Sequence, residues 1–142
     1  MNYKVPAYRC VLVRESSRDM NAQKKISSSD AAIKVSVQLL KDSPNEQLIV
    51  FCLDTKNRII GYQVATVGTL DASLVHPREI FRSAILLNAS SIIIAHNHPS
   101  GDLTPSKEDY AVLNRLDEAG QVIGIDCLDS IIVNHETGVS MR

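Results

Sequence analysis

Residues 91–109 read SIIIAHNHPSGDLTPSKED, and this stretch says most about the fold and the chemistry of the chain. Its apolar beginning predicts a short buried β-strand. His96 and His98 follow at the end of that strand, and residues two apart in extended backbone point to the same side. After a proline-containing loop, Ser106 and Asp109 have the spacing of a helix capping box. The stretch therefore predicts a strand, a fixed loop and a helix that bring four polar side chains together.

Two imidazoles and one carboxylate around an open fourth position are the usual ligand set of a catalytic zinc ion. His96, His98 and Asp109 are the candidate ligands. A helix N-terminus suits the carboxylate because its free N–H groups and dipole favour negative charge. Zinc lowers the pKa of a bound water to about 7, which predicts a hydroxide-like nucleophile at neutral pH. A hydrogen-bonded polar cluster without metal is the alternative interpretation.

A hydrolase of this kind also needs a general base that does not bind the metal. Residues 48–53 form a second apolar run, which predicts a strand beside residues 91–95 in the sheet. Glu46 precedes this run and is the candidate base, and Ser106 is the candidate donor to a developing oxyanion. The simpler interpretations are a solvated carboxylate at a strand start for Glu46 and a helix N-cap for Ser106.

Periodicity and turn residues predict the remaining elements. Their order indicates an α/β protein, a three-layer α/β/α arrangement with a mixed central sheet. The chain is long enough for one compact domain over residues 1–142. The predicted strands are 7–14, 48–53, 58–67, 91–95, 122–125, 130–133 and one after the turn at 134–138; the predicted helices are 28–41, 77–87 and 106–119, with Gly120 as the C′ residue of the last.

Composition excludes several classes of protein. Hydrophobic residues make up 44% of the chain and charged residues 22%. These fractions are typical of a soluble globular protein. A net charge of −1 gives no general attraction to nucleic acid or to an acidic membrane. There is no signal region and no apolar run long enough to span a bilayer, which predicts a cytoplasmic location. Three widely spaced cysteines predict reduced thiols rather than disulfides or metal ligands.

The metal-ligand pattern resembles a known motif. His96-x-His98-Pro99, six residues, then Ser106-x-x-Asp109 matches the JAMM motif of the MPN metalloprotease superfamily. The segments GTL (68–70), VHPREIF (75–81) and HNHPSG (96–101) further resemble the RadC family, and the resemblance runs from about residue 28 to 133.

The resemblance implies an MPN/cytidine-deaminase-like fold with zinc held by His96, His98 and Asp109. It also implies Glu46 as general base and Ser106 as oxyanion donor. Larger RadC proteins carry an N-terminal helix-hairpin-helix region. Only 27 residues precede the first predicted helix here, and they contain no paired glycine-containing hairpins, so we expect neither that region nor direct DNA binding.

Another departure lies in the late strand. Family members often have Asp-His where this chain has Asp129-Ser130. The missing imidazole changes the expected surroundings of the site, whereas metal ligation does not depend on it.

The sequence thus predicts a zinc-dependent hydrolase of peptide or isopeptide bonds, with a peptide or protein substrate, no membrane partner and a homodimer as an allowed assembly. One alternative is a non-catalytic, metal-bearing interaction module associated with DNA processing. The other is a metal-dependent nuclease. A nuclease needs a basic groove for phosphates, which the near-neutral charge disfavours. The presence of Glu46 disfavours a pure scaffold, because a scaffold needs no base.

Overall fold

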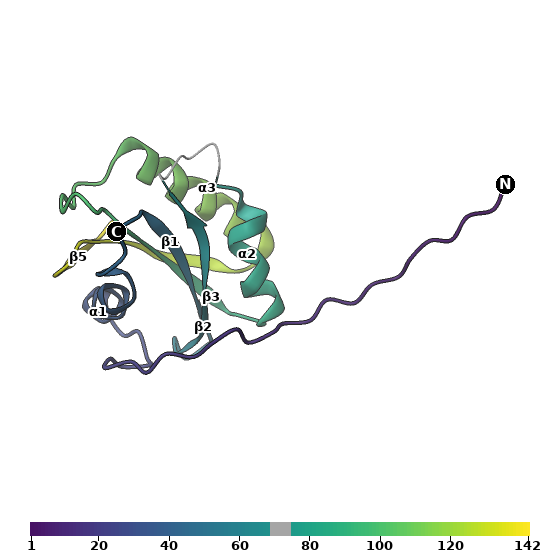
Figure 1. Cartoon of the computed structure of the whole chain (residues 1–142), viewed down its shortest axis with the longest axis horizontal. Helices are drawn as coiled ribbons and strands as arrows, with labels where there is room; N and C mark the ends of the chain where they lie inside the picture. Colours follow the sequence, from purple (N-terminus) through teal and green to yellow (C-terminus); the bar gives the residue numbers. More distant parts are fainter. Residues whose placement is uncertain (69–74) are drawn as a thin grey trace.

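A mixed sheet of five strands forms the middle of the computed structural model, which describes residues 1–68 and 75–142 (Figure 1). The strand order is β2-β1-β3-β4-β5. Strands β3 and β4 are parallel, and the other neighbouring pairs are antiparallel. The elements are α1 (Ser29–Leu40), β1 (Gln47–Leu53), β2 (Ile59–Val67), α2 (Pro77–Leu86), β3 (Ser91–Asn97), α3 (Lys107–Ile123), β4 (Asp126–Val133) and β5 (Gly138–Ser140).

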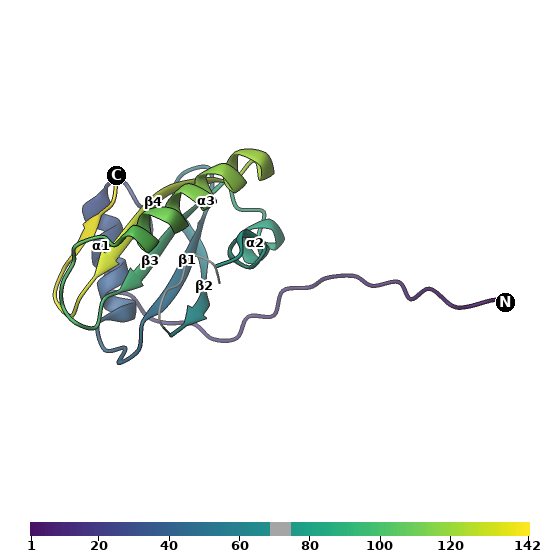
Figure 2. The same cartoon turned by 90° about the horizontal axis from the view of Figure 1, so that it is seen from above.

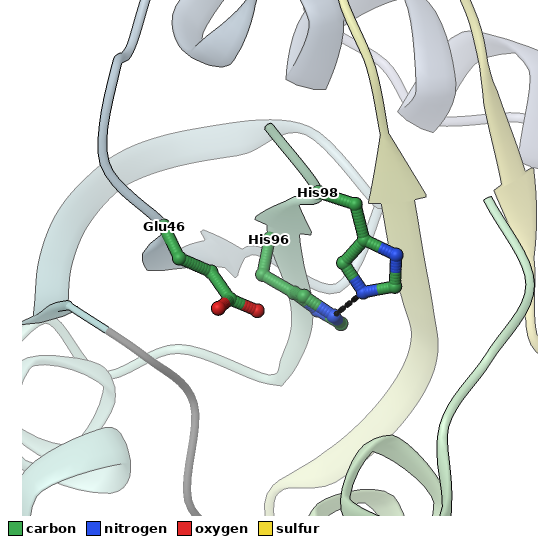
Figure 3. Close-up of side chains that lie close together, drawn as sticks. All are labelled: Glu46, His96 and His98. Atoms are coloured by element: carbon green, nitrogen blue, oxygen red, sulfur yellow. Dashed lines mark hydrogen bonds between the residues drawn. The ribbon is translucent and has the colours of Figure 1, made fainter. Parts of the chain in front are cut away.

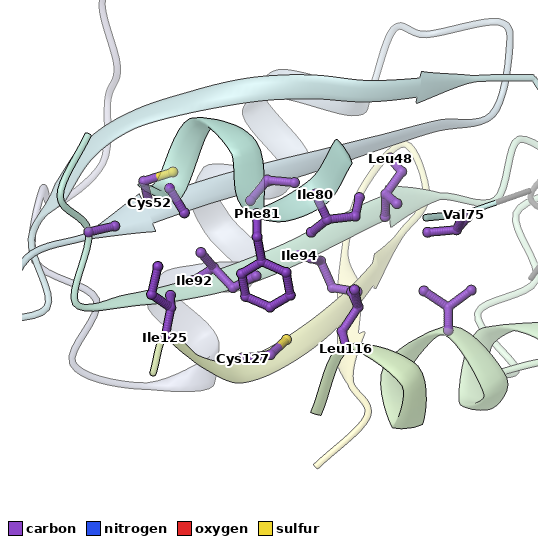
Figure 4. Packing of buried hydrophobic residues seen from close by; sticks show 14 of the residues in the cluster. Leu48, Cys52, Val75, Ile80, Phe81, Ile92, Ile94, Leu116, Ile125 and Cys127 are labelled. Atoms are coloured by element: carbon purple, nitrogen blue, oxygen red, sulfur yellow. The ribbon is translucent and has the colours of Figure 1, made fainter. Parts of the chain in front are cut away.

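Helices cover both faces of this sheet, as the views in Figures 1 and 2 show. Alternate residues of β1 bury their side chains on opposite faces, as expected of a strand with two buried faces. Ile49, Phe51 and Leu53 belong to the core cluster beneath α1. Leu48 and Cys52 belong to the cluster beneath α2 and α3 (Figure 4). The predicted three-layer α/β/α arrangement is therefore confirmed.

The prediction that the two apolar strands are adjacent in the sheet is also confirmed. Strand β1 pairs antiparallel with β3, and Leu48 lies opposite His96. Glu46 is two residues before Leu48 and immediately precedes β1. It therefore lies near the end of β3 that carries the histidines. None of the described helices has the length and apolarity needed to cross a bilayer.

The predicted end of the third helix is wrong. Helix α3 continues past Ala119 to Ile123, and Gly124, with φ of 84°, is its left-handed C-cap. Gly120 lies inside the helix, where a Cβ atom would come within 2.5 Å of the Ile125 carbonyl oxygen. This glycine permits close packing of helix on backbone, and the predicted strand at 122–125 is instead the last helical turn and its cap.

Gly120→Ala is expected to destabilise the fold although alanine favours helix. The added methyl group meets backbone that cannot rotate away, and overpacking of this kind costs about 1–3 kcal/mol. Urea unfolding followed by circular dichroism measures the effect. Asn114→Ala, on the exposed side of α3, is the matched control and should be neutral or slightly stabilising. Equal stability of the two variants would contradict the packing role.

The predicted strand at residues 7–14 is also wrong for the single chain. Residues 1–19 are exposed and extend away from the sheet (Figure 1). The chain joins the fold at Met20 and Ala22, which pack against the α1 cluster. Strand propensity reflects packing against neighbouring strands, and this segment has no neighbour in the described part of the chain.

The three thiols are free, as predicted. Cys10 is exposed in the N-terminal segment, whereas Cys52 and Cys127 are buried. Burial raises the pKa of both buried thiols, that of Cys127 to about 12. The buried cysteines are therefore core residues with little thiolate character.

Candidate metal centre

Three side chains converge where β3 ends and α3 begins. The Nε2 atoms of His96 and His98 are 3.1 Å apart (Figure 3). Asp109, in the first turn of α3, places Oδ1 2.9 Å from the His96 Nε2 atom and Oδ2 3.4 Å from the His98 Nε2 atom. The structure therefore brings together the three residues that the sequence proposed as ligands.

These separations fit a zinc-sized ion. Zinc binds nitrogen and oxygen ligands at about 2.0–2.1 Å with tetrahedral geometry, so neighbouring ligand atoms lie about 3.3 Å apart. The contacts among the three side chains are 2.9, 3.1 and 3.4 Å, and the two contacts of Asp109 are made by different oxygens of its carboxylate. Imidazole nitrogens and carboxylate oxygens are also donor types that zinc prefers.

The tautomer of His98 supports the same conclusion. Its Nδ1 atom lies 2.7 Å from the backbone carbonyl oxygen of Asp102. Because a carbonyl only accepts, Nδ1 carries the proton and Nε2 presents its lone pair to the cluster. The buried His96 has no hydrogen-bond partner for its Nδ1 atom among the described residues. A cation would give the closely spaced Nε2 atoms of the two imidazoles a shared partner.

A capping box fixes the carboxylate. The Ser106 hydroxyl oxygen accepts from the Asp109 N–H at 3.1 Å. In return, the Ser106 N–H donates to Asp109 Oδ2 at 2.7 Å. Burial raises the pKa of the Asp109 carboxyl, but hydrogen bonds from His96 and Ser106 outweigh that effect and lower it to about 2. The carboxylate is therefore ionised at neutral pH and binds a cation without first losing a proton.

Glu46 lies beside the histidines, just before β1 (Figure 3). One ligand atom from each of Glu46, His96 and His98 lies within 4.8 Å of the other two. This group could itself hold a metal, and Asp109 also contacts both histidines, at 2.9 and 3.4 Å. Glu46 and Asp109 are thus both placed to complete a metal site with the two histidines.

The cluster opens into a cavity of about 370 Å³. Its walls come from the segment before β1, from the loop after β3 and from the first turn of α3. A substrate in this cavity would touch the candidate base and the candidate oxyanion donor together. The lining residues are Glu46, His98, Pro99, Ser100, Ser106, Glu108 and Asp109.

Asn97, between the two histidines, holds the segment that carries Glu46. Its side chain is buried, its Oδ1 atom accepts from the Gln47 N–H at 2.7 Å, and its Nδ2 group donates to the Asn45 carbonyl at 3.0 Å. These bonds bracket Glu46 on both sides. The Glu46 carbonyl also accepts from the Gly68 N–H at 2.7 Å. From the sequence, Asn97 has only a loop-shaping role, because nothing local reveals a partner 50 residues away.

Asn97→Ala should loosen this segment and leave the metal ligands in place. The substitution leaves one backbone donor and one backbone acceptor without their hydrogen-bond partner. Each buried unpaired group costs about 1–3 kcal/mol of stability. We expect faster hydrogen exchange at the Gln47 amide and a lower melting temperature, with zinc affinity within a few-fold of the parent. Ser100→Ala, in the exposed loop beyond His98, is the control. Unchanged exchange at Gln47 would contradict the bracketing role.

Comparison with known proteins places the chain. A family model described as a RadC-like JAB domain matches residues 26–142. The chain belongs to this family. The RadC-like chain is 41% identical over 120 residues to a UPF0758 protein of Methanosarcina barkeri, covering 84% of this chain and 52% of that one. The predicted RadC membership is thus confirmed.

Two other UPF0758 proteins show similar relationships. The one from Thermotoga maritima is 53% identical over 93 residues, covering 66% of this chain and 42% of its own length. The one from Staphylococcus carnosus is 44% identical over 123 residues, covering 87% and 54%. The RadC-like chain therefore spans about half the length of the curated relatives it matches. Family membership and the Glu46-His96-His98 group together support a JAMM-like metal hydrolase at the level of the family.

Proposed function

We propose that the RadC-like chain is a zinc-dependent hydrolase of peptide or isopeptide bonds, with zinc held by His96, His98 and Asp109. One observation carries the proposal: three side chains of the right chemistry contact one another at 2.9, 3.1 and 3.4 Å at the edge of an open cavity. When bound, zinc supplies a Lewis acid that polarises a carbonyl group and lowers the pKa of a water ligand to about 7.

Glu46 is the general base in this proposal. Its carboxylate takes a proton from the attacking water as the amide carbonyl carbon is attacked, and later passes that proton to the leaving amine. The half-buried position of Glu46 beside the histidines supports this role. Asn97 acts through Glu46 as a positioning residue, because it fixes the backbone on both sides of the base.

Ser106 stabilises the developing negative charge. Its capping bond uses an oxygen lone pair as acceptor, so the hydroxyl proton is still available to another group. Ser106 lines the cavity, where its hydroxyl group donates a hydrogen bond to the carbonyl oxygen of the substrate as negative charge develops there. Helix capping and catalysis therefore do not compete for the same part of the hydroxyl group.

The charge of the cavity favours an amide substrate over a phosphodiester. Three of its lining residues, Glu46, Glu108 and Asp109, carry carboxylates. The described residues that line it include neither lysine nor arginine. Nucleic acid binding depends on neutralising phosphates with such cations, so an acidic cavity argues against the nuclease alternative.

A substrate screen tests the proposal. Zinc-loaded protein is incubated with an unstructured peptide library, an isopeptide-linked conjugate, and single- and double-stranded DNA and RNA. We expect cleavage of an amide substrate that stops when a chelator removes the metal. Cleavage of nucleic acid alone would favour the nuclease. Partner binding that survives chelation, without cleavage of any substrate, would favour the interaction module.

A further inference from the structure

The N-terminal segment, residues 7–14, has the composition of a strand and nothing to pair with among the described residues of its own chain. It reads AYRCVLVR, rich in the residues that favour sheets. Tyr8 is 88% exposed and Val13 is 83% exposed. Leaving several large apolar side chains in water forgoes the favourable free energy of burying them. The segment is therefore suited to join a sheet as an additional strand.

Strand β2 offers the complementary surface. It stands at the end of the strand order and pairs with β1 alone among the described strands. The exposed fraction is 38% for Ile60, 37% for Tyr62 and 44% for Val64. Because these residues lie at alternate positions, they form an apolar stripe on one face. A long apolar edge strand is a template for pairing with another strand.

The beginning of the β2 edge already makes strand-like hydrogen bonds to another segment of the chain. The Ile59 N–H donates to the Lys24 carbonyl at 2.9 Å, and the Ile26 N–H donates to the Asn57 carbonyl at 2.8 Å. Residues 24–26 thus lie antiparallel along the beginning of β2, at its outer edge. The rest of the outer edge, residues 60–67, extends beyond this contact.

The chain's own N-terminal segment is led away from that edge. The Asn21 N–H donates to the Gln38 Oε1 atom at 3.0 Å, and the Gln38 Nε2 group donates back to the Asn21 carbonyl at 2.6 Å. These bonds tie the chain to α1 instead of β2. Before this point, residues 1–19 run outward without returning to the sheet (Figures 1 and 2). The geometry therefore favours an acceptor on another molecule.

We propose that residues 7–14 of one copy pair with the β2 edge of a second copy, and that the exchange is reciprocal. Each molecule supplies one strand and one edge, so the assembly closes as a two-fold symmetric dimer. Main-chain hydrogen bonds to β2 supply affinity, and the alternating apolar side chains cover the β2 stripe. This inference does not depend on the hydrolase activity.

Cross-linking through Cys10 tests the pairing and tells the two copies apart. Cys10 is an exposed thiol within the segment, and the other two cysteines are buried. Tyr62→Cys and Val64→Cys each place a second exposed thiol on β2. Paired strands lie about 4.8 Å apart, within the Cα separations that a disulfide allows. Mild oxidation should give a covalent dimer, and peptide mapping should find Cys10 joined to the new cysteine.

Controls separate specific pairing from random oxidation. Val122→Cys adds an equally reactive thiol on α3, at a side chain that is 89% exposed, and should give no such cross-link. Cys10→Ser in the Tyr62→Cys background should abolish the link. A disulfide within one chain would overturn the proposal, because the segment would then fold back on its own β2. A link between two Cys10 residues alone would overturn it as well.

Light scattering gives an independent test on the unmodified chain. We expect a mass of twice the 15.6 kDa chain at tens of micromolar protein. Val11→Pro removes a backbone donor in the middle of the segment and should weaken the dimer at least tenfold. Since Val11 is outside the folded core, the circular dichroism spectrum of the variant should remain that of a folded α/β protein. A monomeric parent, or a Val11→Pro variant that dimerises as strongly as the parent, would overturn the proposal.

Discussion

His98→Ala is expected to lose zinc. The substitution removes one of three converging donors, and the remaining imidazole and carboxylate cannot complete a tetrahedral site. Loss of an outer-shell partner alone weakens metal affinity about 10–100-fold, so loss of a ligand should exceed roughly 100-fold. Elemental analysis of the purified protein and competition with a chromogenic chelator measure the change. Zinc should also stop raising the melting temperature, because ligand stabilisation requires affinity for the native state.

His135→Ala is the matched control for this experiment. His135 is exposed in the turn before β5, outside the metal-ligand cluster. Its Nδ1 atom makes a hydrogen bond with the Lys41 carbonyl oxygen. The variant should keep about one zinc ion per chain. Should His98→Ala bind zinc with the affinity of the parent, the ligand assignment on which the proposed hydrolase depends would be wrong.

Glu46→Gln should retain zinc and lose amide hydrolysis. Glutamine has the shape of glutamate but cannot take up the proton that the reaction releases, and general base catalysis contributes about 10²–10⁴-fold. We expect kcat to fall within this range with little change in KM, because substrate contacts are retained. Steady-state kinetics on the best substrate from the screen, combined with zinc analysis of the same sample, checks both parts.

This variant also decides between two possible third ligands. If Glu46 bound the metal in place of Asp109, Glu46→Gln would weaken zinc binding as well as activity. Glu108→Gln is the control, because Glu108 lines the same cavity from the first turn of α3 and has no role in the proposed mechanism. Full activity of Glu46→Gln would rule out the proposed base, whatever its zinc content.

The sequence predicted the parts of the site that depend on local geometry. The alternation of a strand places His96 and His98 together, and the capping box places Asp109 at a helix start. To place Glu46 near the histidines, the prediction also had to assume that the two continuous apolar runs form adjacent strands. The register between Leu48 and His96 bears out that assumption.

The sequence failed where a residue's role depends on distant chain. Gly120 fits a helix C-cap as well as it fits close packing, and only the path of β4 decides between the two. Asn97 bonds to residues far away along the chain, at Asn45 and Gln47. Residues 7–14 have strand composition, but a strand exists only with a neighbour. Residues 69–70 of the GTL segment lie outside the described residues, so their contribution remains a prediction.

The shared use of the Asp109 carboxylate couples two events that are usually independent. The Oδ2 atom that accepts the Ser106 N–H also faces His98. Binding of an ion to this oxygen therefore also affects the stability of the first turn of α3. The coupling is reciprocal. If a bound ion suppresses fraying of that turn by some factor, fraying weakens the affinity of the site for the ion by the same factor. The start of this helix would thus report on the occupancy of the centre.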